Sequence, residues 1–366
     1  MWVRRISVDG FRNLSLSDVP LAKGINILYG DNAQGKTNIL EAMYFCAIGR
    51  SPRADNNREL VRFGMEEAHV QIDVDRDDYD FVIDAHVKIS GNKSIKTISI
   101  DRNVIKNTRE LFGRLMVVLF SPEDLRLIKA GPAERRRFMD MEICQLSPVY
   151  YSDLRDYYRG LKQRNQLLKT LRRDRSQIDS LPIWDEQLNI NGCRIMRTRA
   201  AFVSKVSGIA RKIHSHITDG KEELTLTYQP NIEDPENYFI QMQKSHERDI
   251  SSGTTSMGIH KDDVLFTIND IPARSFGSQG QQRTAALSAK LAEIEIMRSG
   301  AKSAPILLLD DVLSELDGSR QKFLLTQITD LQTIITCTGL EDVLAKNVAE
   351  ANVMQVRSGE IIGTLQ

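Results

Sequence analysis

Two short stretches of the chain, residues 24–29 and 305–309, are apolar at almost every position, and a third stretch, residues 331–338, also has the pattern of a strand. Continuous apolar runs of this length are typical of strands covered on both faces, as in a parallel sheet. Residues 66–105 show a different pattern, with short β-rich segments on either side of the turn Ser90-Gly91-Asn92. We therefore expect a buried parallel sheet and, packed on that core, a separate antiparallel sheet.

From about Pro148 the apolar residues recur at helical spacing instead. One face holds Leu161, Leu167, Leu168 and Leu171, and a second holds Leu188, Ile195, Phe202, Val206, Ile209 and Ile213. Because Ser180-Leu181-Pro182 interrupts the two patterns, they predict a helical hairpin. Strand patterns return at residues 223–228 and 264–268, and the polar residues 251–255 between them are expected to form a flexible segment.

A phosphate-binding pattern follows the first apolar run. Its residues are Gly30, Asp31, Asn32, Ala33, Gln34, Gly35, Lys36 and Thr37, which fit G-x-x-x-x-G-K-[ST]. The two glycines let the backbone curl so that N–H groups and the start of the next helix point at phosphate oxygens. Lys36 would neutralise the β- and γ-phosphates, and Thr37 would supply a hydroxyl to Mg²⁺. ATP and Mg²⁺ are the predicted cofactors; the alternative is a chance glycine-rich turn.

Two aspartates close the second apolar run. Asp310 is expected to hold Mg²⁺ through water, and Asp311 to orient or deprotonate the attacking water. Together with Lys36 they are the predicted catalytic residues, while Thr37 and Asp310 are the predicted metal ligands. The alternative is a core strand that ends in a solvated acidic loop.

Ser278 precedes a helical pattern that continues to about residue 297. We expect this serine to cap the helix, and the start of a helix is itself an anion site. Since residues 30–37 already hold the phosphates of their own subunit, the Ser278 helix is expected to bind the γ-phosphate on a second copy of the protein. An ordinary capped amphipathic helix is the alternative.

The composition narrows the choice of function. The 366 residues are enough for two domains or for one large head with an insertion. Because 49 basic residues balance 49 acidic ones, a polyanion site has to be a local patch. The four cysteines form no C-x-x-C pair, which suits a reducing compartment. No run approaches the roughly 18 apolar residues of a membrane span, so the predicted location is cytoplasmic, with no membrane partner.

Basic residues collect in the predicted hairpin, where residues 151–180 hold only four acids. A second basic group follows the phosphate loop. The candidate DNA contacts in these two groups are Arg50, Arg53, Arg58, Arg62, Lys162, Arg164, Lys169, Arg172 and Arg173. A solvated helix face is the ordinary explanation of such a run. In an ATPase the same residues would bind DNA phosphates independently of base sequence.

These motifs together resemble the ABC-type ATPase heads of the SMC-like group, and the whole chain resembles the RecF family. The resemblance to the SMC-like group rests on residues 30–37, Ser278-Gln279-Gly280-Gln281, Leu307 to Asp311 and Ser314 to Asp317. The resemblance to the RecF family rests on Phe11-Arg12-Asn13 and on residues 122–140 and 308–325. Two positions depart from the family pattern. Ala130 stands where glycine is usual, and Lys261 stands where arginine is expected. The lysine keeps the positive charge but lacks the forked set of donors that an arginine would offer.

The resemblance implies an α/β fold: an ABC-type P-loop ATPase head with an antiparallel β-subdomain, plus an inserted α-helical arm domain with a short helical hairpin. The head would comprise residues 1–130 and 273–366, and the arm domain residues 131–272.

The same resemblance assigns further ATP-site residues. Arg12, Asn38, Ser278 and Gln281 would contact ATP, the last two on the opposite protomer, and Asp317 would lie in the loop that couples the two sites. The strand at 331–338 lacks the histidine that ABC transporters usually place after it. Thr336 or Thr338 is therefore expected to sense the γ-phosphate in a slow, switch-like ATPase.

By this resemblance, the expected function is ATP-dependent DNA binding in recombinational repair and replication-fork maintenance. An ATP-induced homodimer would bind duplex or gapped DNA, and RecR and RecO-type mediator proteins would help it load a recombinase; slow hydrolysis would release it. An ATP-dependent nuclease, or another SMC-like ATPase that acts on DNA ends, is one alternative; for the nuclease domain we expect no room after the last ATPase strands. A transporter ATPase is another, but it would place the signature much closer to the loop than the 242 positions from Lys36 to Ser278.

Overall fold

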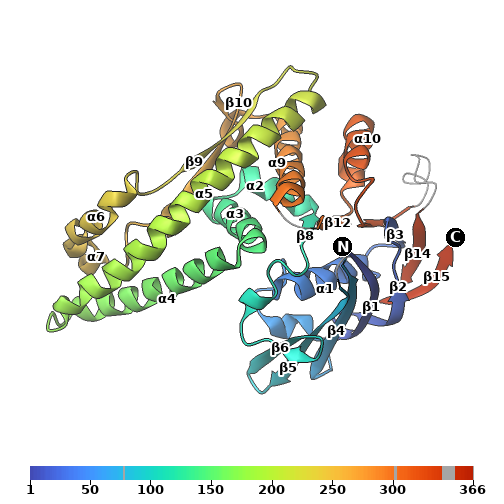
Figure 1. The fold of residues 1–366 in the computed structure, drawn as a ribbon, viewed down its shortest axis with the longest axis horizontal. Helices are drawn as coiled ribbons and strands as arrows, with labels where there is room; N and C mark the ends of the chain where they lie inside the picture. Colours follow the sequence, from blue (N-terminus) through green and yellow to red (C-terminus); the bar gives the residue numbers. More distant parts are fainter. Residues whose placement is uncertain (77–78, 301–302, 340–350, 366) are drawn as a thin grey trace. The chain divides into compact units, whose positions relative to one another are not determined.

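The computed structural model describes residues 1–76, 79–300, 303–339 and 351–365 (Figure 1). By packing, the chain divides into two compact units. Residues 1–124 and 297–366 form the head unit, and residues 125–296 form the arm unit. No helix in the described ranges is long and apolar enough to span a membrane.

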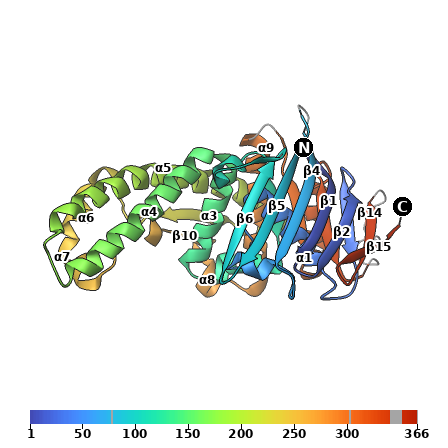
Figure 2. The same cartoon turned by 90° about the horizontal axis from the view of Figure 1, so that it is seen from below.

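The head unit contains a six-stranded antiparallel sheet in the order β2-β1-β4-β5-β6-β7. Its strands are β1 (Trp2–Phe11), β2 (Leu14–Pro20), β4 (Glu67–Asp75), β5 (Phe81–Ser90), β6 (Lys93–Ile100) and β7 (Asn103–Val104). Figure 2 shows β6, β5, β4, β1 and β2 side by side. The side chains of β4 alternate, so Val70 and Ile72 are buried while Gln71 is partly exposed. The predicted antiparallel sheet is confirmed, including the turn at Gly91 between β5 and β6.

The second sheet of the head unit has the order β15-β14-β3-β13-β12-β8. Its strands are β3 (Ile25–Tyr29), β8 (Val117–Phe120), β12 (Ile306–Asp310), β13 (Thr333–Cys337), β14 (Asn352–Arg357) and β15 (Glu360–Leu365). All neighbouring strands run parallel except the β14–β15 pair. The two apolar runs and the predicted strand at residues 331–338 are thus the adjacent strands β3, β12 and β13, with β13 between the other two, and all three are largely buried.

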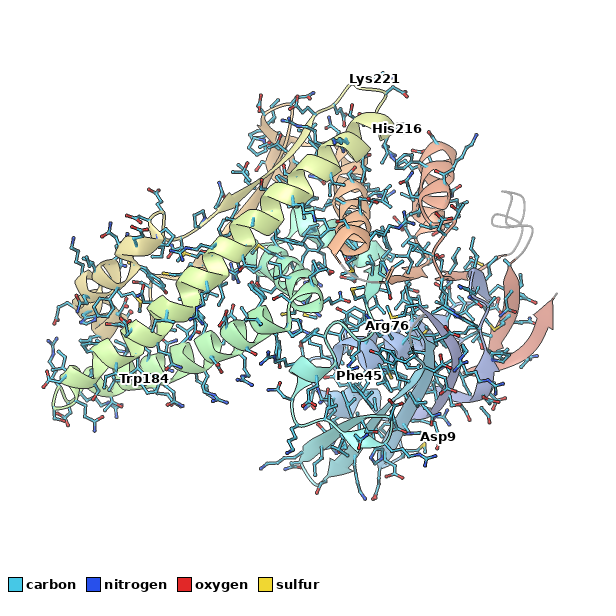
Figure 3. All side chains as sticks on the ribbon, in the orientation of Figure 1. Asp9, Phe45, Arg76, Trp184, His216 and Lys221 are labelled. Atoms are coloured by element: carbon cyan, nitrogen blue, oxygen red, sulfur yellow. The ribbon has the colours of Figure 1, made fainter. Side chains whose placement is uncertain are left out.

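Helix α1 (Lys36–Ile48) lies between the two sheets and contacts strands of both. It is apolar nearly all round, as a helix covered on both sides should be. The ring of Phe45 on this helix lies 5.8 Å from the ring of Phe11 on β1 (Figure 3). The remaining helical elements of the head unit are η1 (Asn57–Leu60), η2 (Thr108–Glu110), η7 (Leu313–Glu315) and α10 (Gly318–Gln327).

The arm unit is built on the predicted hairpin of two helices, α4 (Pro148–Leu171) and α5 (Leu181–Ile217). The break falls at η4 (Ile178–Ser180). Trp184 lies near the start of α5, next to this break, and His216 marks the other end of the helix (Figure 3). Shorter helices complete the unit: α2 (Arg126–Lys129), α3 (Pro132–Leu146), α6 (Tyr238–Lys244), α7 (His246–Ser252) and α8 (Ala273–Phe276), with the 3₁₀ turns η5 (Pro235–Asn237) and η6 (Ile259–Lys261). The chain passes from the head unit into the arm unit at the end of a further 3₁₀ turn, η3 (Pro122–Leu125).

The flexible segment predicted at residues 251–255 is wrong. Helix α7 occupies its first part, and the backbone N–H of Thr255 donates a hydrogen bond to Oδ1 of Asn165 on α4 at 2.7 Å. Thr255 is also buried. The segment is polar because it supplies hydrogen bonds to the interior of the unit.

The prediction that Arg164 contacts DNA is also wrong. Its side chain is 0% exposed. Nε donates to Asp185 at 2.7 Å, and Nη1 donates to Asp249 at 2.8 Å and to the hydroxyl of Thr255 at 2.8 Å. A guanidinium enclosed in this way joins α4 to α5 and α7 and cannot reach a phosphate outside.

Strands β9 (Leu224–Gln229) and β10 (Asp263–Ile268) follow the predicted positions closely, and β11 (Ile271–Pro272), which the sequence pattern did not predict, completes a three-stranded sheet. The arm unit is longer than the predicted arm domain, because it extends to residue 296 rather than 272. Helix α8 packs on β10, and the side chain of Gln282 donates to the carbonyl of Ala273 at 2.9 Å. Most of helix α9 (Gln279–Gly300) therefore packs as part of this unit.

Candidate nucleotide-binding site

The loop between β3 and α1 adopts a shape that requires its two glycines. Gly30 and Gly35 have φ angles of 149° and 112°. A Cβ on Gly30 would collide with the carbonyl oxygen of Val356, and one on Gly35 would lie 2.9 Å from Oδ1 of Asn13. Only glycine fits both the backbone angles and the space at these two positions. Helix α1 begins at Lys36, so its free N–H groups face the loop.

Lys36 is 7% exposed and points back into the loop. Its ammonium donates to the carbonyl oxygens of Gly30 at 2.6 Å and Asp31 at 2.8 Å. The positive charge of Lys36 is thus held inside the loop. The oxygens of a bound phosphate would replace these two carbonyls as acceptors of the ammonium. Residues 31 to 33 are exposed, so their backbone can meet a ligand.

Thr37 and Asp310 meet at the carboxyl edge of the parallel sheet. The hydroxyl of Thr37 donates to Oδ1 of Asp310 at 2.7 Å. The hydroxyl of Thr336 on β13 donates to the same oxygen at 2.9 Å and accepts the backbone N–H of Asp311 at 2.9 Å. Asp311 has a left-handed φ of 52°, which this hydrogen bond helps to hold. Thr336, expected to sense phosphate, is 1% exposed and binds both predicted catalytic acids.

The oxygens of Thr37 and Asp310 suit Mg²⁺, a hard cation with oxygen ligands. No group of three or more His, Cys, Asp and Glu side chains able to hold a metal ion occurs among the described residues. A site with one carboxylate and one hydroxyl fits a cation that takes its other ligands from water and nucleotide phosphates.

Gln34 is bound by the turn between β14 and β15. The backbone N–H of Ser358 donates to Oε1 of Gln34 at 2.7 Å, and the N–H of Gly359 donates to its carbonyl oxygen at 2.8 Å. The sequence motif predicts Gln34 in the phosphate loop but does not indicate these partners. Nothing local could have shown them, because the turn lies more than 300 positions away.

Glu41 on α1 is a functional candidate that the sequence analysis missed. Its carboxylate is 1% exposed and accepts hydrogen bonds from Nε of Arg12 at 3.0 Å, Nη2 of Arg12 at 2.8 Å and the hydroxyl of Ser51 at 2.5 Å. Arg53 approaches it to 3.7 Å. The available signal was a lone acid among the apolar residues 39–48 of this helix. Arg12, predicted to contact ATP, and Arg53, predicted to contact DNA, therefore share one buried carboxylate.

A cavity of about 950 Å³ lies beside Asn38 of α1. Its wall includes the arginines Arg12, Arg58 and Arg62 and the ring of Phe63. Phe63 is 104% exposed, whereas Arg62 is half-buried and donates to the carbonyl of Asn13 at 2.9 Å. The cavity combines cations with an open aromatic face and is large enough for a nucleoside.

Ser278 caps helix α9, as predicted. Its backbone N–H donates to Oε1 of Gln281 at 2.8 Å, and its hydroxyl accepts the N–H of Gln281 at 3.2 Å. This reciprocal pair is a capping box, and it leaves Ser278 exposed. Gln281 also donates to Glu222 at 3.0 Å, within the arm unit. In the head unit, Asp317 is exposed and caps α10 by accepting the N–H of Arg320 at 3.0 Å.

Other candidate DNA contacts lie on the surface of their own units. Arg50, Arg53 and Arg58 are exposed in the head unit, as are Lys162, Lys169, Arg172 and Arg173 in the arm unit. Only Arg164 is removed from the set by full burial.

Known proteins match this chain along most of its length. The model of the AAA domain family matches residues 5–192. The chain is 44% identical over 361 residues to the DNA replication and repair protein RecF of Agathobacter rectalis and 46% identical over 361 residues to that of Lachnoclostridium phytofermentans; each alignment covers 99% of both chains.

Solved structures give the same result. A structure described as the recombination mediator protein RecF-ATP in the RecFOR pathway matches with a TM-score of 0.91 and 35% identity, covering 100% of this chain and 98% of that one. An Smc head domain from Pyrococcus furiosus, 18% identical, has a TM-score of 0.56 with 100% and 96% of the two chains covered, and shares the fold. The predicted ABC-type head with its antiparallel sheet and helical arm is thereby confirmed, and the chain belongs to the RecF family of DNA replication and repair proteins.

Proposed function

We propose that this protein is an ATP-dependent DNA-binding protein of recombinational repair and replication-fork maintenance. The observation that carries the proposal is the 2.7 Å hydrogen bond between Thr37 and Asp310, which brings the loop and the acidic strand end into one nucleotide and metal site. The names of its relatives, DNA replication and repair proteins and a mediator of the RecFOR pathway, support the same role.

ATP would occupy the loop at residues 30–37, with its nucleoside in the cavity lined by Arg12 and Phe63. Lys36 would exchange the carbonyls of Gly30 and Asp31 for phosphate oxygens. Mg²⁺, held near Thr37 and Asp310, would supply charge neutralisation at the phosphates. Asp311, fixed by Thr336, would orient the attacking water.

ATP would also bridge two copies of the protein. The exposed, capped helix start at Ser278 offers free N–H groups to an anion, and its capping partner Gln281 is beside it. A γ-phosphate bound to Lys36 of one protomer would meet Ser278 of the other, and Asp317 would connect the two sites. Because each site is incomplete alone, nucleotide binding would drive dimerisation.

Duplex or gapped DNA would contact one face of α4. Arg155, Arg159, Lys162 and Lys169 recur at intervals of four, three and seven residues, so they lie along one helix face. Tyr157, Arg164 and Leu168 form the buried face. The sequence has no acid between Asp156 and Asp174, so the exposed face is cationic from Arg159 to Lys169, whereas Arg155 pairs with Asp156 at 3.0 Å. Such a row would grip phosphates independently of base sequence, together with Arg172, Arg173 and the head-unit arginines Arg50, Arg53 and Arg58.

In the resulting cycle, ATP closes the dimer on DNA, RecR and RecO-type mediators act with it to load a recombinase, and slow hydrolysis releases it. A buried threonine in place of a switch histidine suits slow turnover, because Thr336 cannot act as an acid or base near neutral pH.

Lys36→Ala tests the proposal. The variant should lose ATP-dependent dimerisation in sedimentation and ATP-dependent binding of gapped DNA, whereas Lys23→Ala, an exposed lysine of the same unit, should behave as wild type. ATP-dependent dimers and tight DNA binding in the Lys36 variant would refute the proposed ATP-dependent dimer on DNA.

A further inference from the structure

We infer that the turn between β14 and β15 is part of the nucleotide site, where it holds the phosphate loop in its binding shape through Gln34. Gln34 is then a positioning residue rather than a phosphate ligand. The inference rests on the proposed function, since it concerns the same loop.

The first support is a pair of hydrogen bonds to one loop residue. Ser358 N–H donates to the side-chain oxygen of Gln34 at 2.7 Å, and Gly359 N–H donates to the main-chain oxygen at 2.8 Å. One bond fixes the side chain and the other fixes the peptide that precedes Gly35. The rotation of that peptide sets the direction of the Gly35 N–H, which a phosphate cradle needs to point inward.

The second support is the geometry of the turn itself. Ser358 and Gly359 both have left-handed backbones, with φ angles of 52° and 83°. A Cβ on Gly359 would collide with the carbonyl oxygen of Asn13, and the Gly359 carbonyl accepts the N–H of Ser15 at 3.0 Å. The turn therefore packs directly against the β1–β2 turn, and together the two turns brace the loop.

The third support is the strand behind the turn. β14 pairs in parallel with β3, the strand that leads into the loop, from Asn352 opposite Asn26 to Gln355 opposite Tyr29. The carbonyl of Val356 then fills the place where Gly30 would carry a side chain. Both ends of the loop, at Gly30 and Gln34, consequently depend on residues 356–359.

The braced loop is preorganised, so ATP does not have to order it on binding. If the turn no longer held the loop, Lys36, Thr37 and Asp310 would still be present. The free-energy cost of ordering the loop would then oppose ATP binding. We therefore expect a lower affinity for ATP but an unchanged rate of hydrolysis of the ATP that is bound.

Two variants test the contact between Gln34 and the β14–β15 turn, one on each side of it. Gln34→Met keeps the length of the side chain but removes the acceptor, and Gly359→Ala displaces the turn without touching the loop residues. Each should raise the Kd for ATP about three- to tenfold, the range for one lost hydrogen bond. Gly363→Ala is the matched control, because Gly363 lies in the same hairpin and a Cβ there meets nothing within 4 Å.

Equilibrium binding of a fluorescent ATP analogue measures the Kd, single-turnover hydrolysis at saturating ATP measures the rate of the bound nucleotide, and thermal unfolding reports the fold. The inference holds if the Kd rises in both variants, the single-turnover rate stays within about twofold and the double variant is no worse than the more affected single variant. Wild-type affinity in folded Gln34→Met overturns it. If Gly359→Ala does not fold, the outcome is decided by Gln34→Met alone. Wild-type protein that fails to bind ATP would instead refute the proposed function.

Discussion

The hydroxyl of Thr37 and the carboxylate of Asp310 are 2.7 Å apart although 273 positions separate them in the sequence. The sheet order explains this contact. β3 and β12 are both parallel to β13, which lies between them, so the loop after β3 and the acids after β12 emerge at the same edge. Thr336, on β13 itself, bridges the two.

We expect Asp310→Asn to abolish most metal-dependent hydrolysis. The amide keeps the shape of the side chain but loses the charge that attracts Mg²⁺, so ATP turnover should fall about 100-fold or more. Nucleotide binding without Mg²⁺ should persist, because Lys36 and the loop remain. Asp330→Asn, an exposed acid of the head unit, should leave turnover unchanged. Steady-state hydrolysis with a Mg²⁺ titration measures both, and normal turnover in Asp310→Asn would exclude a metal role.

We expect Thr336→Val to slow hydrolysis without weakening ATP binding. Valine fills the same volume but removes the donor to Asp310 and the acceptor for the N–H of Asp311. Loss of a buried hydrogen bond of about 1 to 1.5 kcal/mol corresponds to roughly tenfold in turnover if it acts in the transition state. Thr336→Ser, which restores the hydroxyl, should recover most of the rate. Equal rates in the valine and serine variants would show that the hydroxyl has no such role.

The strands of the catalytic core were predictable because burial on both faces requires an almost continuous run of apolar residues. The runs that lead to Tyr29 and to Asp310 are apolar apart from Asn26 and Asp310 itself, and the loop residues between β3 and α1 follow a fixed pattern. The capping pair Ser278 and Gln281 was also predictable, since its bonds are local.

Other parts of the site and fold were not predictable from local sequence. Arg164 and Lys162 look alike in a basic run, and only tertiary packing makes one a buried partner of Asp185 and leaves the other in solvent. Helices α6 and α7 have seven residues each, too short for a clear helical period. Gln34 depends on a turn far along the chain.

We expect Lys162→Ala to weaken DNA binding at every base sequence. The lysine is exposed on the cationic face of α4, so its loss removes one phosphate contact. The slope of log K against log salt should become less steep by about 0.9, the value for one phosphate charge. Lys244→Ala, exposed on α6, is the control with an equal change in charge. Binding isotherms at several salt concentrations measure the slope, and identical slopes in wild type and Lys162→Ala would remove α4 from the DNA surface.

We expect acid to destabilise the protein through His260. Burial is the main cause that lowers the pKa of His260 to about 4, and the cations Lys261, Arg136 and Arg164 add to it. Nδ1 lies 3.0 Å from the Tyr157 hydroxyl and Nε2 lies 3.1 Å from the Thr255 carbonyl, and a neutral ring with its proton on Nε2 satisfies both partners.

Since the folded pKa lies below the ordinary value of 6.5, the unfolded chain binds the proton first as the pH falls. The stabilisation is complete above about pH 6.5 and is lost progressively down to pH 4, with about 2 kcal/mol of unfolding free energy lost between pH 7 and pH 5. His260→Asn keeps a donor and an acceptor but cannot titrate, so urea unfolding at the two pH values should show a smaller loss in this variant. His216→Asn, at an exposed position on α5, should keep the wild-type loss. Equal losses in wild type and His260→Asn would mean that other groups cause the acid sensitivity.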